Sequence, residues 1–126
     1  MTENSPKIVI IGGGFGGLFT ALDLSGAGHV TLINDEDHFL FKPMLYEYLS
    51  GEVEAWHIAP DCKELLDSDA TFIKGRVAGI DLSSQTLSLE GQKEPLRYHV
   101  LVISPGAVTN YAGVVGAEEF SLASAP

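Results

Sequence analysis

Ile8-Val9-Ile10-Ile11-Gly12-Gly13-Gly14-Phe15-Gly16-Gly17-Leu18 sets the architecture of the chain. Its four β-branched residues predict a short buried strand, and a helix-forming run, 18–24, follows the glycines. Glycine occupies the first, third and sixth positions of the turn, which is the arrangement that binds a dinucleotide between a strand and a helix. The alternative is a glycine-rich turn without a ligand. Five glycines in six positions disfavour it, because they weaken a fold unless something must approach the backbone.

Each motif glycine has its own steric task. Gly12 permits the tight turn out of the strand, and Gly17 lets the helix pack closely on that strand. Gly14 lacks a Cβ, so a pyrophosphate can approach the backbone, and the helix N-terminus presents free N–H groups to it. The cofactor-binding residues predicted in this turn are Gly12, Gly13, Gly14, Phe15, Gly16 and Gly17.

A complete βαβ unit surrounds this motif. The pattern predicts a helix over 15–25, which Gly26-Ala27-Gly28 ends, and a buried parallel strand over 30–33. An acidic residue that binds the ribose is expected at the end of this second strand. Either Asn34 forms that hydrogen bond, or the strand runs one residue further and Asp35 forms it. We interpret Glu36 and Asp37 as a solvated acidic turn.

An aromatic segment, 38–51, follows the acidic turn. A helix is expected from about Pro43 to Leu49, with Phe39, Tyr46 and Tyr48 in ordinary core packing. Lys42, next to Pro43, could face an electron-rich ring or a phosphate.

A second short helix is expected over 60–66, and it carries Cys62 beside Lys63. A neighbouring cation lowers a thiol pKa, so Cys62 is either a reactive thiol or, as we favour, a small half-buried residue.

The second half of the chain is rich in strands. The pattern predicts strands over 71–74, 76–82, 86–90 and 96–98, and a parallel core strand over 100–103 that Ser104-Pro105-Gly106 closes. The predicted fold class is α/β, with a Rossmann-like parallel sheet and a small antiparallel β-meander.

Composition excludes several classes of function. The chain has 126 residues, one cysteine and a formal net charge of −10, which argue for one domain and against nucleic acid, charge-driven docking on an anionic bilayer, and a disulfide framework. No apolar run reaches the length of about 20 residues that spans a membrane. The leader 1–7 is too short and polar for a targeting peptide, so we expect a cytoplasmic location. The four histidines lack metal-site spacing, and no metal site is predicted.

Three features together resemble flavoproteins with two dinucleotide-binding domains: the βαβ start, the meander, and Tyr98-His-Val-Leu-Val-Ile-Ser-Pro-Gly106. The last run departs from the usual Tyr-Asp and Ala-Thr-Gly pattern and keeps its glycine. The segment FLFKPMLYEYLSGEVEAWHIAP, 39–60, is similar to type II NADH dehydrogenases, which are NAD(P)H:quinone oxidoreductases. Within them it resembles the cyanobacterial and plastid branch that includes demethylphylloquinone reductase.

The resemblance implies that the first fingerprint binds FAD. It places Lys42 and Pro43 against the flavin, Val77 at the position whose backbone meets the adenine, and Gly106 at the return of the chain to the flavin. It also implies hydride transfer from NAD(P)H through FAD to a quinone, with no catalytic side chain in this segment.

The resemblance covers essentially the whole chain but only the first quarter to third of such enzymes. We therefore expect an N-terminal portion, inactive alone, without the NAD(P)H-binding part and the C-terminal part that places the longer enzyme on the cytoplasmic face of a thylakoid or plasma membrane. Two alternatives are a non-catalytic dinucleotide-binding fragment and a relative of sulfide:quinone oxidoreductase, which needs more cysteines than Cys62. The quinone, the choice between NADH and NADPH, and a homodimeric state are left open.

Overall fold

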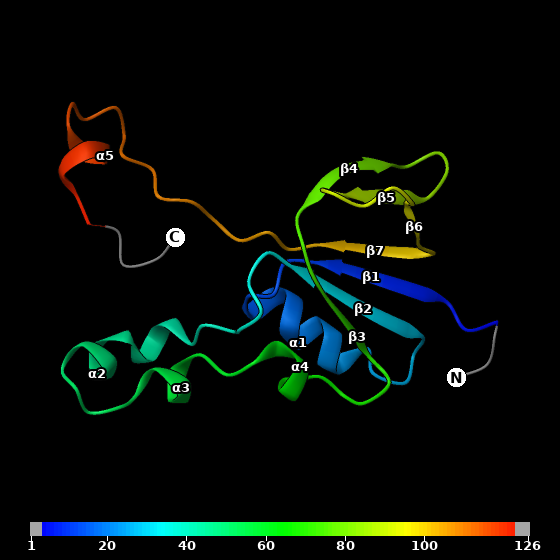
Figure 1. The fold of residues 1–126 in the computed structure, drawn as a ribbon, viewed down its shortest axis with the longest axis horizontal. Coiled ribbons are helices and arrows are strands. Elements are labelled where there is room, and N and C mark those ends of the chain that lie inside the picture. The colour runs from blue at the N-terminus through cyan, green and yellow to red at the C-terminus, as the bar shows by residue number, and fades with distance from the viewer. Residues whose placement is uncertain (1–3, 123–126) are drawn as a thin grey trace.

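A four-stranded parallel sheet forms the centre of the computed structural model, which describes residues 4–122 (Figure 1). The strand order is β3-β2-β1-β7. The strands are β1 (Lys7–Ile11), β2 (His29–Asn34), β3 (Thr71–Lys74) and β7 (Val100–Ile103). Because all of these pairs are parallel, the carboxyl ends of the four strands lie at one edge of the sheet. The predicted fold class is confirmed.

Helix α1 (Phe15–Asp23) covers one face of this sheet. Alternate residues of a strand point to opposite faces, so Ile8 and Ile10 of β1 pack toward Leu18 of α1. The helix ends two residues earlier than predicted, and Gly26 adopts a φ of +82° just beyond it. The core on this side consists of Ile8, Ile10, Leu18, Ala21, Val30, Leu32, Phe39, Cys62 and Leu66.

The antiparallel meander covers the other face. It consists of β4 (Val77–Asp81), β5 (Thr86–Leu89) and β6 (Leu96–Arg97), in the order β4-β5-β6. Val9 and Ile33 of the parallel sheet pack against Leu87, Leu89 and Tyr98. The period-two pattern of 86–90 therefore predicted the correct buried face.

The aromatic segment forms an arm of short helices that extends away from the sheet (Figure 1). The arm contains the 3₁₀ turn η1 (Lys42–Met44), helix α2 (Leu45–Leu49) and the following helix α3 (Ala55–Ile58). Helix α4 (Cys62–Leu65) returns to the sheet, where Cys62 is part of the core. Phe39 is buried as predicted, but the core placement of two tyrosines is wrong: Tyr46 is 82% exposed and Tyr48 is 44% exposed. The arm has too few surrounding elements within residues 4–122 to cover both of its faces.

Strand β7 pairs with β1 as the predicted parallel strand, but it is not a core strand. Val100 and Ile103 are exposed, because β7 forms the edge of the sheet in the described part of the chain. The segment after β7 runs outward and ends in α5 (Ala117–Phe120). No helix within residues 4–122 is long and apolar enough to cross a bilayer.

Candidate functional site

The glycine turn lies at the carboxyl edge of the sheet, where β1 leads into α1. Gly12 has a φ of +102°, and a Cβ added to it would lie 1.9 Å from the carbonyl oxygen of Ser104. A Cβ on Gly17 would lie 1.6 Å from the carbonyl oxygen of Gly12. The predicted roles of Gly12 in the turn and Gly17 in close helix packing are therefore confirmed by contacts within the protein.

Gly14 differs from these two glycines. It is exposed, its φ of −78° suits any residue, and a Cβ added to it would meet no described protein atom within 4 Å. Neither the local backbone nor packing within residues 4–122 therefore requires glycine here. The open space in front of Gly14 is where an external group would approach the turn.

Helix α1 begins at this open space. Gly14 is its N-cap, no side chain caps it, and no acidic residue occupies its first turn. The first described bond of the helix runs from the Leu18 N–H to the Gly14 carbonyl, so the N–H groups before Leu18 have no partner within the helix. These N–H groups and the helix dipole make the turn suitable for an anion such as a pyrophosphate.

Asn34 lies beside the turn and closes β2. Its Oδ1 accepts a hydrogen bond of 2.9 Å from the Gly13 N–H, and its Nδ2 donates one of 2.9 Å to the Glu36 carbonyl. The carbonyl of Asn34 accepts a third bond from the Gly75 N–H at 2.8 Å. Asn34 thus ties the glycine turn to the acidic turn and to the end of β3. It is the last residue of β2, and Asp35 is the first residue beyond the strand.

A pocket of about 240 Å³ opens at the same edge. It is smaller than the roughly 300 Å³ at which pockets for whole drug-sized ligands begin, so it suits one half of a dinucleotide. At its rim, the Arg76 guanidinium lies 3.5 Å from the Asp35 carboxylate. The residues that line the pocket are Ile11, Gly12, Ile33, Asn34, Asp35, Gly75, Arg76, Val77 and Pro105.

The structure brings four of the predicted site residues to this pocket: Gly12, Asn34, Asp35 and Val77. Lys42 and Pro43 do not line it; both are exposed on the arm, in η1. Gly106 follows the lining residue Pro105 and has a φ of +81°.

Phe15 links the turn to the arm. Its ring lies 5.0 Å from the Phe39 ring and 5.6 Å from the Phe41 ring, measured between centroids. Phe41 directly precedes Lys42 and Pro43, so the aromatic contacts hold the start of η1 beside the glycine turn.

Gly75, Arg76 and Ser104 are among the residues at the site that were missed from the sequence. Gly75 and Arg76 follow β3, whose parallel pairing with β2 brings them to the carboxyl edge. Ser104 follows β7, and its Oγ lies 2.5 Å from the position of a Cβ on Gly16. An assignment of 71–74 as a parallel strand would have identified the first two.

Comparison with known proteins agrees with this geometry. A model of the family described as pyridine nucleotide-disulphide oxidoreductases matches residues 6–125. The chain belongs to this family.

Two curated members of the pyridine nucleotide-disulphide oxidoreductase family narrow the similarity. The chain is 40% identical to demethylphylloquinone reductase NdbB of Synechocystis over 97% of its own length and 33% of that protein. It is 36% identical to the alternative NAD(P)H-ubiquinone oxidoreductase C1 of Arabidopsis thaliana over 92% of its own length and 26% of the relative. These matches confirm the resemblance to type II NADH dehydrogenases. The chain spans about a third or less of these relatives.

A solved structure supports the same fold. NDH2 of Plasmodium falciparum, in complex with NADH, superposes with a TM-score of 0.80 at 24% identity, and the match covers 94% of this chain and 26% of that one. At this identity the match shows the fold alone.

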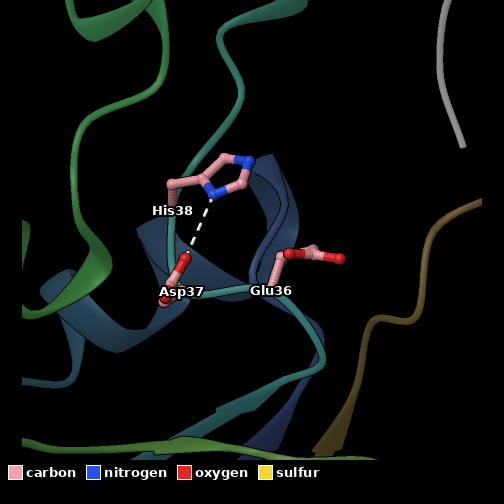
Figure 2. Close-up of side chains that lie close together, drawn as sticks. All are labelled: Glu36, Asp37 and His38. Carbon is pink, nitrogen blue, oxygen red and sulfur yellow. Dashed lines mark hydrogen bonds and ion pairs between the residues drawn. The ribbon is translucent and has the colours of Figure 1, made fainter.

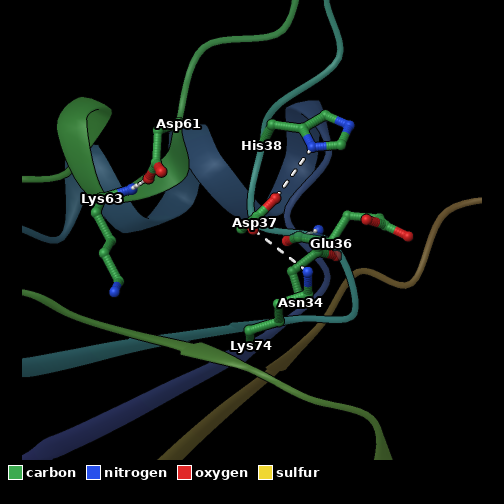
Figure 3. Close-up of polar contacts among 7 residues, drawn as sticks. All are labelled: Asn34, Glu36, Asp37, His38, Asp61, Lys63 and Lys74. Carbon is green, nitrogen blue, oxygen red and sulfur yellow. Dashed lines mark hydrogen bonds and ion pairs between the residues drawn. The ribbon is translucent and has the colours of Figure 1, made fainter.

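The acidic turn is exposed, as predicted. Asp37 Oδ1 lies 3.2 Å from His38 Nδ1, and Lys74 Nζ donates to Asp37 Oδ2 at 3.3 Å. These two partners, His38 first, hold the pKa of Asp37 below its ordinary value. Figure 3 shows the Asp37 carboxylate between the ring and the ammonium group.

Glu36, Asp37 and His38 bring one potential metal-ligand atom each to within 4.8 Å of one another. All three are exposed, and Figure 2 shows a dashed contact between Asp37 and His38 and none to Glu36. Because Lys74 and His38 already occupy the Asp37 carboxylate, we interpret the group as a surface ion-pair cluster.

Cys62 is fully buried rather than half-buried. Burial, followed by the charges of Asp61 and Asp37, raises the pKa of its thiol, so Lys63 does not activate it. The interpretation of Cys62 as a packing residue is favoured, and the sulfide:quinone alternative is correspondingly weaker.

Proposed function

We propose that this chain is the FAD-binding portion of a flavin-dependent NAD(P)H:quinone oxidoreductase. The observation that carries the proposal is Gly14, which has open space before it at the N-terminus of α1. Gly12 and Gly17 are required by close contacts with the protein's own backbone. Gly14 has no such contact, so we explain it by the close approach of a bound ligand.

The described residues fit the parts of FAD in turn. The turn from Gly12 to Gly17 would receive the pyrophosphate on backbone N–H groups. The pocket at the ends of β2 and β3 would receive the adenosine, with Val77 at the adenine and Asn34 or Asp35 at the ribose. Lys42, Pro43 and Gly106 stay predicted contacts of the flavin ring.

The flavin supplies the redox chemistry when it is bound, and the protein supplies binding and orientation. A quinone and NAD(P)H are proposed as substrates because the names of the similar proteins include a phylloquinone derivative, ubiquinone and NAD(P)H. Since the chain spans about a third or less of these relatives, we propose that this segment binds FAD without turning over NAD(P)H alone.

The first experiment measures FAD binding by the purified chain through quenching of flavin fluorescence. We expect binding by the unaltered chain and a loss of at least about tenfold in Gly14→Val, whose methyl groups would occupy the space of the pyrophosphate. Gly79→Val is the matched control, because Gly79 lies in β4 and a Cβ there meets only the Ser88 hydroxyl at 3.4 Å. No FAD binding by the unaltered chain, or equal binding by Gly14→Val, would refute the proposal.

The second experiment separates an enzyme portion from a non-catalytic dinucleotide-binding module. A chain extended to the length of the similar proteins is expected to be yellow, to bleach with NADH or NADPH, and to regain its colour with a quinone. An extended protein that binds FAD and stays oxidised with both nucleotides would favour the non-catalytic alternative.

A further inference from the structure

A group of basic side chains lies at the amino edge of the parallel sheet, at the opposite end from the glycine turn. Lys7 begins β1 and is paired in register with His29, which begins β2. His99 directly precedes β7, and Arg97 ends β6, which leads into β7 at the same edge (Figure 1). The pairing of β1 with β2 and with β7 therefore gathers residues from three distant parts of the sequence.

Two pockets open between these residues, and Lys7 and Arg97 line both of them. The larger has a volume of about 330 Å³, which lies within the range of small-molecule sites, and the rest of its lining is Val9, His29, Thr31, Pro95 and Leu96. The smaller has a volume of about 300 Å³, and the rest of its lining is Ser84, Gln85, Tyr98 and His99. Because two residues belong to both linings, the pockets adjoin at Lys7 and Arg97.

The charge of these pockets is opposite to that of the chain as a whole. The chain has 17 Asp and Glu against 7 Lys and Arg, yet no carboxylate is among the described residues that line either pocket. Neither Lys7 nor Arg97 forms an ion pair within residues 4–122, whereas Lys74 and Arg76 each form one. Two unpaired cations that face the same space repel each other, and an anion between them would replace this repulsion by attraction.

His99 adds a hydrogen-bond donor whose position is fixed by the backbone. Its Nδ1 accepts a bond of 2.8 Å from the Lys7 N–H, and its own N–H donates to the Lys7 carbonyl at 2.8 Å. Since Nδ1 is an acceptor, we assign the ring proton to Nε2. The His29 N–H is also bonded, to the Pro6 carbonyl at 2.8 Å. These backbone N–H groups are therefore in use, and side chains would hold a ligand at this edge.

We propose that the two pockets bind the phosphate group of a small organic phosphate ester. An arginine binds phosphate through parallel N–H groups, and a lysine adds a compact positive charge. Arg97 and Lys7 would hold the phosphate where the pockets adjoin, and His99 Nε2 would donate to the same group. The organic part would contact Val9 and Leu96, which contribute apolar atoms to the larger pocket. This site lies at the opposite edge of the sheet from the one proposed for FAD and does not depend on it.

Phenyl phosphate and inorganic phosphate are the probes, since they share the phosphate and differ in the apolar group. Their affinities for the full 126-residue chain are measured by ligand-observed ³¹P NMR titration at low salt concentration, because salt screens exposed charges. We expect both to bind, and phenyl phosphate to bind at least about threefold more tightly because its ring buries apolar surface. Equal affinities would overturn the ester and favour free phosphate as the ligand.

Arg97→Gln and Lys7→Gln test the two cations. Each is expected to lose about tenfold in affinity for phenyl phosphate, as when a charge-assisted hydrogen bond is removed. Lys93→Gln is the matched control, because it removes the same charge from an exposed residue between β5 and β6 that lines neither pocket. Its affinity should stay within about twofold of the unaltered chain, and equal losses in all three variants would exclude a specific site. Circular dichroism checks each fold, and Arg97→Gln carries the test if Lys7→Gln unfolds.

Gly14→Val separates this site from the proposed FAD site, because the glycine turn is the other place in the chain where a phosphate is expected to bind. Gly14→Val should keep its affinity for phenyl phosphate while it loses FAD. If Gly14→Val loses phenyl phosphate and Arg97→Gln keeps it, the probe binds at the glycine turn, and the amino-edge site is excluded while the proposed function stands. Failure of both probes to bind the unaltered chain would also exclude the amino-edge site and leave FAD binding unaffected.

Discussion

Gly17→Ala adds one methyl group where α1 meets β1. The new Cβ would lie 1.6 Å from the Gly12 carbonyl oxygen, 2.8 Å from its carbonyl carbon and 3.5 Å from Ile10 Cγ2. The first contact is with backbone, so no side-chain rotation relieves it, and the start of α1 must move by more than 1 Å to restore an ordinary separation of about 3.5 Å. Movement of α1 disturbs its packing on Ile10 and Leu32 of the core.

The free energy of unfolding should fall accordingly. Overpacking in a close-packed site costs typically about 1–3 kcal/mol and occasionally more, and a clash between backbone atoms belongs at the upper end. Alanine in place of glycine within a helix recovers about 1 kcal/mol. We therefore expect a net loss of about 2 kcal/mol or more, which lowers the melting temperature by about 8 °C, at about 4 °C per kcal/mol for a domain of this size.

Thermal and urea unfolding, followed by circular dichroism, measure this difference. Gly14→Ala is the control, because a Cβ there meets no described atom within 4 Å. As an N-cap change it should cost no more than about 1 kcal/mol. Equal melting temperatures for Gly17→Ala and Gly14→Ala would refute the reasoning that separates Gly17, which packs against backbone, from the exposed Gly14.

Three further predictions concern the core, the acidic turn and the thiol. Leu32→Ala removes a fully buried side chain and should cost about 2–5 kcal/mol in urea unfolding; a loss below about 1 kcal/mol would contradict the assigned core. Because the folded-state pKa of Asp37 is lowered, its hydrogen bond with His38 and its ion pair with Lys74 stabilise the fold above about pH 4, and this stabilisation disappears as the pH falls through the folded-state pKa. The melting temperatures of Asp37→Asn and the unaltered chain should therefore differ at pH 6 and converge as the pH falls through the folded-state pKa, and a difference that persists in acid would exclude this source. The Cys62 thiol should react with Ellman's reagent at pH 8 only after urea is added, and rapid labelling of the native chain would contradict its burial.

The sheet and the glycine turn could be predicted because local pattern determines them. The order of a β-branched run, a turn with fixed glycine positions and a helix predicts a strand–turn–helix unit of the dinucleotide-binding type. Gly12 and Gly17 make the close backbone contacts that this unit predicts. The parallel strand β7 was predicted from a continuous apolar run, but its pairing with β1 and its place at the edge of the sheet were not, since Val100 and Ile103 are as apolar as buried strand residues.

The exposure of the arm and the place of Arg76 at the site could not be predicted from the sequence pattern, for physical reasons. Helices of four or five residues, such as α3, are too short to show a helical period. Tyr46 and Tyr48 were predicted as core residues, but both are exposed. The spacing of aromatic residues in the sequence is the same whether they pack in the core or lie on an exposed face. Arg76 belongs to the site through the parallel pairing of β3 with β2, which joins residues about 40 positions apart.

Strand β7 has a consequence for work with the purified chain. Within residues 4–122 it pairs on one side only, so its other side offers a row of backbone N–H and C=O groups flanked by Val100 and Ile103. An unpaired edge strand of this kind can form backbone hydrogen bonds with a second molecule and start aggregation. The net charge of −10 keeps molecules apart through mutual repulsion, and this repulsion shortens in range to about 10 Å at 0.1 M salt. We therefore expect the chain to stay monomeric in buffers of low salt concentration and to associate through its β7 edges at high salt concentration.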